Sequence, residues 1–331
     1  MSFFGKKKSK KLTRLFFATD IHGSERTYRK FINAGKFYEV NIIVMGGDIS
    51  GKLMIPIIKE GNGNYRATLQ GTVHKVTTEA ELKQLQETIG LLGFYSQIME
   101  DDEYKSLAGH PEEVNKLFHK LARERLANWV DLAETRLKGT GIRCFVTGGN
   151  DDDPEVLDAI KGEGRESFMA CEAKVVQIDD DHVMASVGFS NLTPWHTPRE
   201  IPDEKLGEII EGMCAQVKDF QHCIFNFHVP PIDSTLDSCP KLDWNTDPPS
   251  PVMSGGQIVF AGAGSQAVRN AIEKHQPMLG LHGHIHEAQG VVKIGRTTCI
   301  NPGSEYGEGI LRGCLVTFAD GVIEGFQMTS G

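Results

Sequence analysis

The sequence predicts an α/β fold that contains a sheet of parallel strands. Two observations support this prediction. Short runs of β-branched and aromatic residues alternate along the chain with segments of helical periodicity. Five of the apolar runs are followed directly by clusters of Gly, Asp, Asn or His. Since ligands of open α/β folds bind beyond the carboxyl ends of the strands, these clusters predict one shared site.

Length and composition are those of a globular protein. The chain has 331 residues, which corresponds to about two domains of ~150 residues or to one large domain with an insertion. The net charge of −9 gives no electrostatic reason to expect nucleic acid as a partner. The seven cysteines are an odd number without a C-x-x-C motif, so we expect reduced thiols and a cytoplasmic protein.

The first 13 residues form a basic tail, with lysines clustered between positions 6 and 11. We expect a solvated tail; contact with an anionic surface is the alternative. The apolar stretch at 15–18 is too short for a signal sequence. No run of ~18 apolar residues occurs, so no membrane-spanning helix and no membrane partner are expected.

The first elements predict a βαβ unit. Residues 14–19 are expected to form a strand, 24–36 a helix with Ser24 as its N-cap, and 41–45 a second strand. Residues 60–138 then interrupt the pattern with a hairpin, turning at Gln70-Gly71, and two helices over 79–99 and 111–138. We expect these residues to be a subdomain inserted into a domain of residues 14–331. It would lie over the site or form a homo-oligomer interface.

The sheet pattern resumes after the insertion. A strand at 142–147 precedes a short helix at 154–161 that begins with Pro. Longer helices are expected over 202–219 and 265–275, and a long loop over 234–256. The remaining β-structure is expected at 173–178, 183–187, 223–227, 278–281, 291–294, 297–300, 313–318 and 322–327.

The five polar clusters contain side chains that bind metal ions. Pooled, they supply Asp20, His22, Asp48, Asn150, His228, His284 and His286. Imidazole mixed with carboxylate and amide oxygens suits divalent Mn, Fe, Zn, Co or Ni. Seven candidates exceed the needs of one ion, but two ions roughly 3.5–4 Å apart that share a carboxylate would use them all. In D-x-H and H-x-H on an extended backbone, both side chains of a pair point the same way.

Each cluster by itself is weak evidence. A G-D pair after a strand is often only a turn, and a buried G-H-x-H can be a pair of hydrogen-bonded core histidines. All five clusters in this order, each after a predicted strand, make the metal site the stronger interpretation.

The combined pattern resembles the calcineurin-like metallophosphoesterase superfamily over about residues 14–300. The matching motifs are Asp20-Ile21-His22, Gly47-Asp48, Gly149-Asn150-Asp151-Asp152, His228 and Gly283-His284-Ile285-His286. The resemblance implies a four-layer α-β-β-α sandwich with a dinuclear centre between its sheets. It also implies one metal held by Asp20, His22, Asp48 and His286. A second metal would share Asp48 and be completed by Asn150, His228 and His284.

One position departs from the family pattern. The residue after the metal-binding Asn is usually His, where it assists the leaving group or the transition state, and here it is Asp151. A carboxylate beside two cations stays ionised and is a poor proton donor near neutral pH. His196 is our candidate substitute, and an ordinary loop His is the alternative.

Three other residues are candidates for substrate contacts. Arg199 could bind a phosphate oxygen, with a surface salt bridge as its alternative role. Trp195 and Trp244 could stack on a nucleobase, or simply pack under a loop. Substrate selection is expected in the loops around 186–200 and 229–256.

The sequence therefore predicts a dinuclear metal-dependent phosphoesterase. We expect it to hydrolyse a small phosphodiester, with cyclic nucleotides among the candidates, by attack of metal-bound hydroxide. The alternatives are a phosphomonoesterase and a catalytically weak protein-binding scaffold of the same fold. A nuclease is disfavoured because no basic cluster follows residue 11.

Overall fold

The computed structural model describes residues 12–107, 109–162 and 164–331. The fold is α/β, as the sequence predicts. The predicted lysine cluster at 6–11 lies outside the described residues. No helix within the described ranges is long and apolar enough to cross a membrane.

The first sheet has six strands in the order β22-β21-β1-β2-β7-β8. Four of them, β1, β2, β7 and β8, run parallel to one another, and β21 and β22 are antiparallel additions at one edge. The strands are β1 (Thr13–Ala18), β2 (Ile42–Met45), β7 (Arg143–Val146), β8 (Phe168–Ala170), β21 (Arg312–Ala319) and β22 (Val322–Ser330). Helix α1 (Glu25–Phe37) joins β1 to β2 in the predicted βαβ unit, and its N-cap Ser24 accepts a hydrogen bond from the Thr27 N–H.

The second sheet also has six strands, in the order β19-β20-β18-β11-β10-β9. Its central strands β10, β11, β18 and β20 are parallel. Its strands are β9 (Val175–Gln177), β10 (Val183–Val187), β11 (Cys223–Phe227), β18 (Leu279–Leu281), β19 (Gly290–Ile294) and β20 (Thr297–Asn301).

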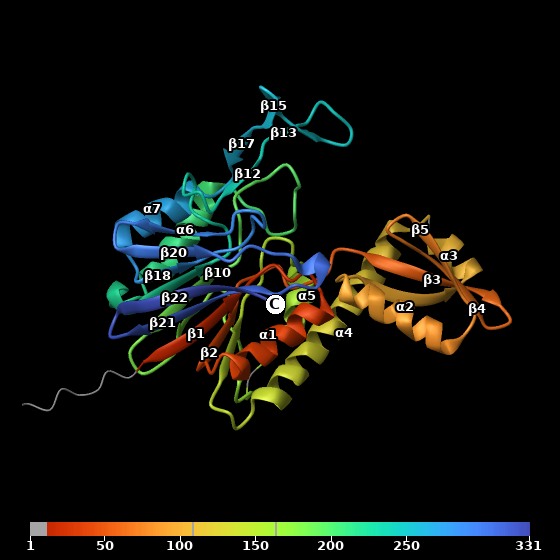
Figure 1. Ribbon diagram of the computed structural model, residues 1–331, viewed down its shortest axis with the longest axis horizontal. Helices are drawn as coiled ribbons and strands as arrows, with labels where there is room; N and C mark the ends of the chain where they lie inside the picture. The colour runs from red at the N-terminus through yellow and green to blue at the C-terminus, as the bar shows by residue number, and fades with distance from the viewer. Residues whose placement is uncertain (1–11, 108, 163) are drawn as a thin grey trace, which may run out of the picture.

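One apolar core lies between the two sheets, and each sheet is covered by helices on its other side (Figure 1). Successive side chains of β1 point to opposite faces of the first sheet. Leu15 and Phe17 lie in the core between the sheets, whereas Phe16 and Ala18 face the helices. Helices α1 and α4 (Pro111–Leu137) cover the first sheet, and α6 (Asp203–Cys214) and α7 (Gln266–His275) cover the second. Burial on both faces explains why these strands appear in the sequence as continuous apolar runs.

The segment between β2 and β7 forms a separate four-stranded sheet that projects from the rest of the molecule (Figure 1). It has its own core, which includes Ile57, Ala67, Leu85 and Ile89. Its elements are β3 (Met54–Gly61), β4 (Asn64–Leu69), β5 (Thr72–Val76), α2 (Glu79–Leu91), β6 (Tyr95–Glu100) and α3 (Asp101–Leu107).

This segment differs from the sequence prediction in two ways. The hairpin turn at Gln70-Gly71 is confirmed. The single helix expected over 79–99 is wrong in its last part, because residues 95–100 form a strand. Helix α2 ends at Leu91 because Gly93 has φ +88°, and the chain then enters β6, which pairs with β3. The second expected helix is α4, which packs in the core of the first sheet. The segment with its own core, residues 54–107, therefore differs in extent from the insertion predicted at 60–138.

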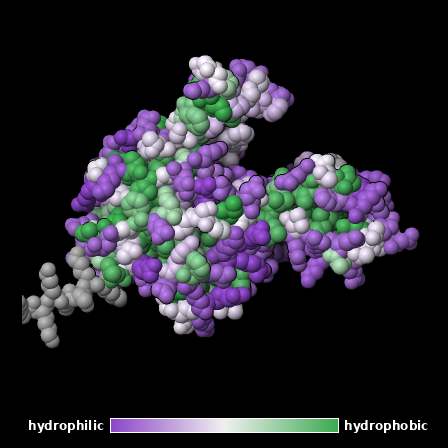
Figure 2. Space-filling model, viewed as in Figure 1, coloured by the Kyte–Doolittle hydropathy of each residue, from purple (hydrophilic) through white to green (hydrophobic). Residues whose placement is uncertain are grey.

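A second excursion occupies residues 238–262 and overlaps the long loop that the sequence predicts over 234–256. It consists of short strand pairs that extend away from the second sheet (Figure 1). They are β12 (Ser238–Pro240) with β17 (Phe260–Gly262), β13 (Leu242–Asp243) with β14 (Ser250–Pro251), and β15 (Met253–Ser254) with β16 (Gln257–Ile258). The excursion shows apolar surface (Figure 2), to which Met253, Ile258 and Phe260 contribute.

The short helices complete the fold. α5 (Pro154–Leu157) begins with the predicted Pro and is followed by the 3-10 turn Asp158–Ile160. Two further 3-10 turns are Phe220–His222 and Tyr306–Glu308.

Candidate metal centre

The predicted ligands follow the carboxyl ends of parallel strands from both sheets. Asp20 and His22 follow β1, Asp48 follows β2, and Asn150 follows β7. His228 follows β11, and His284 and His286 follow β18. The structure brings all seven side chains into one cluster, because the two sheets present these strand ends at the same edge of the molecule.

Four of the seven side chains form one tight group. One ligand atom from each of Asp20, His22, Asp48 and His286 lies within 4.8 Å of the others. His22 Nε2 lies 3.0 Å from His286 Nε2 and 3.7 Å from Asp48 Oδ2. His286 Nε2 also lies 3.4 Å from Asp20 Oδ1.

The other three gather around the amide of Asn150. Asn150 Oδ1 lies 3.1 Å from His228 Nε2 and 2.7 Å from His284 Nδ1. His228 Nε2 is 3.4 Å from Asp48 Oδ1. Asp48 therefore directs one carboxylate oxygen toward each group.

Burial and charge explain the ionisation of the cluster. Burial lowers the pKa of His22 to about 3 and that of His284 to about 4, so both imidazoles are neutral and able to act as ligands. Burial opposes ionisation of Asp20, but the charge of His228 and a hydrogen bond to His286 outweigh it and lower its pKa to about 2. Burial likewise disfavours charge on His228, but Asp48 and Asp20 outweigh it and raise the pKa of His228 to about 10, so this imidazole carries a proton that a metal ion would have to displace.

The residues fit a divalent metal. Two imidazole nitrogens, His22 Nε2 and His286 Nε2, point at each other over 3.0 Å beside two buried carboxylates. The other nitrogen of His22, Nδ1, is buried and has no hydrogen-bond partner among the described residues. Convergent nitrogen and oxygen lone pairs at this density are the donor set of a first-row divalent ion.

The backbone of the cluster is strained. Asp20, His22, Asp48 and His284 have φ values of 53°, 40°, 48° and 67°. Such left-handed conformations cost non-glycine residues roughly 1–2 kcal/mol each. Backbone hydrogen bonds hold the strain in place, since His22 N–H donates to Asp48 O at 2.9 Å and Asp20 N–H donates to Gly47 O at 3.0 Å. Strain of this kind concentrates at functional sites.

Asp152 ties two of the ligand loops together. Its buried carboxylate accepts backbone N–H groups from Ile49 at 3.0 Å, Ser50 at 2.7 Å and Gly149 at 2.7 Å. It therefore joins the loop after β2, which carries Asp48, to the loop after β7, which carries Asn150. The sequence pattern marks this position only by its acidic residue.

Asp151 lies beside the cluster and is paired with a lysine that the sequence analysis missed. Its backbone N–H donates to Asp48 Oδ1 at 2.9 Å, and its Oδ2 lies 2.5 Å from Lys52 Nζ. Burial and the charge of Asp48 raise the pKa of Asp151, while Lys52 lowers it. A signal for Lys52 was present, because it lies in the same short loop as Asp48.

Tyr306 is a second neighbour that the sequence analysis missed. Its ring centroid lies 4.6 Å from that of His22. It comes from a 3-10 turn near the end of the chain, and no motif marks it.

The structure does not bring Arg199 into the site. Its guanidinium is buried and donates to Gly149 O at 3.0 Å and to Glu172 Oε1 at 2.6 Å. It also stacks over Phe189, with 4.5 Å from its guanidinium carbon to the ring centroid. Arg199 is therefore engaged in holding the loop that carries Asn150 and is not placed to bind a phosphate.

His196 is likewise outside the cluster. It is exposed and does not line the cavity above the site. Its neighbour Thr197 makes the contact instead, since its Oγ1 accepts a hydrogen bond from Asn150 Nδ2 at 2.8 Å.

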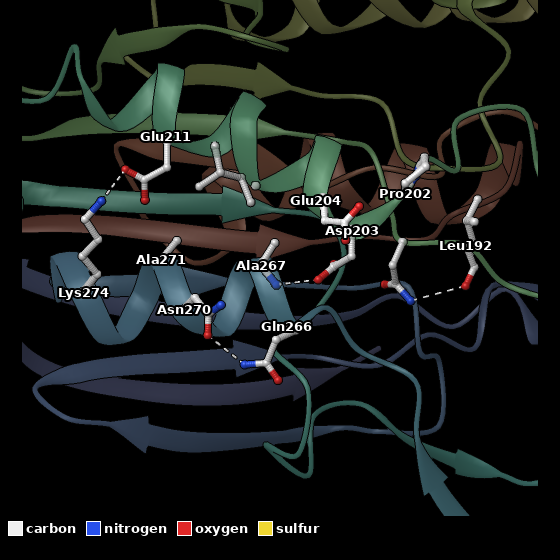
Figure 3. Close-up of a pocket in the computed structure, with 13 residues that line it drawn as sticks. Leu192, Pro202, Asp203, Glu204, Glu211, Gln266, Ala267, Asn270, Ala271 and Lys274 are labelled. Atoms are coloured by element: carbon white, nitrogen blue, oxygen red, sulfur yellow. Dashed lines mark hydrogen bonds and ion pairs between the residues drawn. The ribbon is translucent and has the colours of Figure 1, made fainter.

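The cluster forms part of a cavity of about 700 Å³. Asp48, Asn150, His284 and His286 line it together with Lys52 and Asp151. The rest of its wall comes from the loops around 193–197, 239–244 and 261–263 and from Ile285 and Glu287. A cavity of about 800 Å³ lies elsewhere, between α6 and α7 (Figure 3). None of the predicted site residues line that second cavity, whose wall includes Gly207, Ala267 and Ala271.

Comparison with known proteins gives limited similarity. No protein-family model matches the chain. The uncharacterized protein MJ1162 of Methanocaldococcus jannaschii is 29% identical over 157 residues, which are 46% of this chain and 61% of that protein. The chain thus matches about three-fifths of the length of this relative.

One solved structure shares the fold at low sequence identity, and two others superpose less well. One crystal structure superposes with a TM-score of 0.53 at 12% identity, covering 96% of this chain and 99% of the other. The protein TT1561 of Thermus thermophilus gives a TM-score of 0.49 at 12% identity, with 97% and 99% covered. A novel archaeal phosphodiesterase gives 0.33 at 10% identity, with 96% and 100% covered. The last two values are too low to support a conclusion about this chain.

Proposed function

We propose that this protein is a metal-dependent phosphoesterase that hydrolyses a small phosphodiester. The observation that carries the proposal is the convergence of seven ligand-type side chains in which Asp48 directs one oxygen to each of two groups. We also propose that the two sheets and their outer helices correspond to the four-layer α-β-β-α sandwich that the sequence resemblance implies.

The two groups of side chains would each hold one ion. The first would be bound by Asp20, His22, Asp48 and His286, and the second by Asp48, Asn150, His228 and His284. When bound, divalent Mn, Fe, Zn, Co or Ni would supply an activated water and neutralise charge on the phosphate.

Residues of the chain itself account for positioning and charge. Lys52 lines the cavity next to Asp48, so its ammonium is placed to attract a phosphate oxygen that enters the site. Asp151 holds this ammonium at 2.5 Å. Thr197 orients the amide of Asn150, and Asp152 fixes the spacing of the loops that carry Asp48 and Asn150. Lys52 takes the phosphate-binding role for which the sequence offered Arg199.

We favour a diester over a monoester as the substrate. The volume of about 700 Å³ leaves room for a second ester group beyond the cluster, and Pro194, Pro240 and Leu242 give that part of the wall an apolar lining. The seven cysteines are free, which supports a reducing compartment, and we propose the cytoplasm.

A paired assay tests the proposal. The protein is stripped of metal, reloaded with Mn²⁺ and given bis(4-nitrophenyl) phosphate or 4-nitrophenyl phosphate. We expect turnover of the diester, lost in Asp48→Asn and kept in Asp131→Asn, which alters an exposed carboxylate on α4. Turnover of the monoester alone would favour a phosphomonoesterase. Bound metal without turnover of either ester would favour the protein-binding scaffold.

For the projecting segment, residues 54–107, we propose a role other than covering the site. None of the residues that line the cavity belong to residues 54–107, so this segment is not placed over the site. We propose that it forms a homo-oligomer interface. Light scattering on the full chain and on a variant with 54–107 replaced by a Gly/Ser linker tests this, and an unchanged oligomeric state would contradict it.

A further inference from the structure

Two tryptophans from separate loops meet at the wall of the cavity. Trp195 precedes α6 in the chain, and Trp244 lies in the excursion of the second sheet. Their ring centroids are 5.2 Å apart with an interplanar angle of 72°, an edge-to-face arrangement. Both indoles line the same cavity as the metal cluster.

Both indoles are exposed to an extent that is unusual for tryptophan. Trp195 is 64% exposed and Trp244 46%, whereas Trp129 is 3% exposed and stacked on Tyr28. An edge-to-face pair uses one face of one ring, so flat aromatic surface remains open for another contact. Exposed apolar surface that lines a cavity is typical of ligand binding.

The loop that presents Trp195 is held by hydrogen bonds and is attached to the cluster. The Glu200 carboxylate accepts the backbone N–H groups of Thr193 at 2.9 Å and Thr197 at 3.1 Å. Thr197 then binds Asn150 at 2.8 Å. The position of Trp195 relative to the candidate metal ligands is therefore set by direct hydrogen bonds.

The cavity wall contains two chemically different sets of side chains. The cluster and Lys52 suit a phosphate group, and the indoles with Pro194 and Leu242 suit a flat apolar group. A sugar would need carboxylate or amide partners for its hydroxyls. The groups of that kind in the wall belong to the cluster or adjoin it in sequence: Asp48, Asn150, Asp151 and Glu287.

We propose that the substrate is a nucleotide whose base stacks on Trp195 and Trp244 while its phosphate lies at the metal cluster. This inference rests on the proposed function only where it places the phosphate at the metal cluster. Base stacking on an aromatic side chain strengthens binding by roughly tenfold or more and tolerates any base.

The test is a binding experiment that needs no turnover. Adenosine 5′-monophosphate is titrated into the Mn²⁺-loaded protein while tryptophan fluorescence is followed. The affinity for ribose 5-phosphate is measured by its displacement of the bound nucleotide. We expect the nucleotide to quench the fluorescence and to bind about tenfold more tightly than ribose 5-phosphate. Trp195→Ala and Trp244→Ala should each remove most of this difference while leaving the affinity for ribose 5-phosphate unchanged.

Further variants separate stacking from general apolar contact. Trp195→Phe should keep most of the nucleotide affinity and Trp195→Leu should not. Phe260→Ala, an exposed aromatic of the same excursion that does not line the cavity, should change neither affinity. Equal affinities for the two ligands, or an equal loss of both in the tryptophan variants, would overturn the inference.

The outcome is distinguishable from that of the proposed function. Tryptophan-dependent nucleotide binding without turnover of either chromogenic ester would support the inference and contradict the phosphoesterase. Turnover of the diester without preference for the nucleotide over ribose 5-phosphate would contradict the inference alone.

Discussion

At the scale of single residues, the cluster depends on backbone that comes very close to its side chains. Gly149 lies directly behind Asp48, and a Cβ at this position would collide with Asp48 Oδ1 and its backbone N. Only glycine leaves the carboxylate where it contacts both groups of ligands. Steric exclusion of a Cβ therefore explains why glycine follows a strand at this position of the sequence.

Gly149→Ala is expected to reduce the metal content of the protein while leaving the fold intact, because the new Cβ displaces Asp48. Elemental analysis after Mn²⁺ loading measures the content, and circular dichroism checks the fold. Gly212→Ala is the control: Gly212 lies exposed in α6, and no atom of the described residues lies within 4 Å of the new Cβ. It should raise the free energy of unfolding by about 0.5–1 kcal/mol and leave the metal content unchanged. A Gly149→Ala protein with full metal content would contradict the steric argument.

Lys52 provides a second residue-scale prediction. Lys52→Met removes the ammonium that faces the phosphate end of the cavity, so kcat for the diester should fall about a hundredfold with a smaller change in KM. Lys59→Met removes a lysine paired with Glu100 at 2.6 Å in the projecting sheet and should leave turnover unchanged. Equal kcat in wild type and Lys52→Met would contradict a role for Lys52 in turnover.

At the scale of elements, the turn between β9 and β10 connects the two sheets. The Asp179 carboxylate accepts hydrogen bonds from Thr13 Oγ1 at 2.5 Å and from the His182 backbone N–H at 2.7 Å, and it lies 2.9 Å from His182 Nδ1. His182 Nε2 accepts the Gly321 N–H at 3.1 Å, so Nδ1 carries the proton and donates it to Asp179. The turn of the second sheet thereby binds β1 and the β21–β22 turn of the first.

Asp179→Asn should lower the free energy of unfolding by about 1–3 kcal/mol at neutral pH. Burial opposes ionisation of Asp179, but hydrogen bonds from His182 and Thr13 outweigh it and hold its pKa below the usual value. Because the pKa is lower in the folded than in the unfolded state, this stabilisation is present above about pH 4 and is lost as the pH falls further. Urea unfolding at several pH values should show the two proteins converging in acid.

Asp181→Asn is the control for this effect, since Asp181 is exposed in the same turn. It should change the free energy of unfolding by less than about 0.5 kcal/mol at any of these pH values. A constant difference between wild type and Asp179→Asn from about pH 7 to about pH 3 would contradict a role for the charge.

At the scale of the whole molecule, residues at the base of the projecting segment contact the loops that carry the metal cluster. Gly93, between α2 and β6, packs so closely that a Cβ would collide with the His22 carbonyl oxygen. The Tyr95 hydroxyl accepts the Gly51 N–H at 2.7 Å, in the loop that also carries Asp48 and Lys52. The segment therefore supports two ligand loops although it contributes no ligand.

Gly93→Ala should lower both metal content and diester turnover, because the new Cβ pushes the His22 loop away from the cluster. Gly63→Ala is the control: Gly63 has a similar positive φ of +76°, but no atom in the described part of the chain lies within 4 Å of the new Cβ. Both variants carry the cost of an alanine in a left-handed conformation, so only the contact with His22 differs. Equal metal content in the two variants would show that the segment does not support the site.

Features that depend on local pattern could be predicted from the sequence. The α/β class and the buried strands follow from runs of β-branched and aromatic residues, and the N-cap at Ser24 and the turn at Gln70-Gly71 follow from local hydrogen bonding and backbone geometry. The candidate ligands could be selected because they directly follow predicted strands.

Contacts between side chains could not be predicted in the same way, because they depend on how the elements pack. Lys52 meets Asp151, Tyr306 meets His22, and Arg199 turns inward to Glu172, through contacts between segments far apart in the chain or through loop conformations without a repeating pattern. Strand β6 was mistaken for helix because its partner β3 lies far from it in sequence, and strand pairing stabilises it against local preference. Local pattern records which face of an element is apolar, whereas the packing of whole elements decides what that face and the loops beyond it contact.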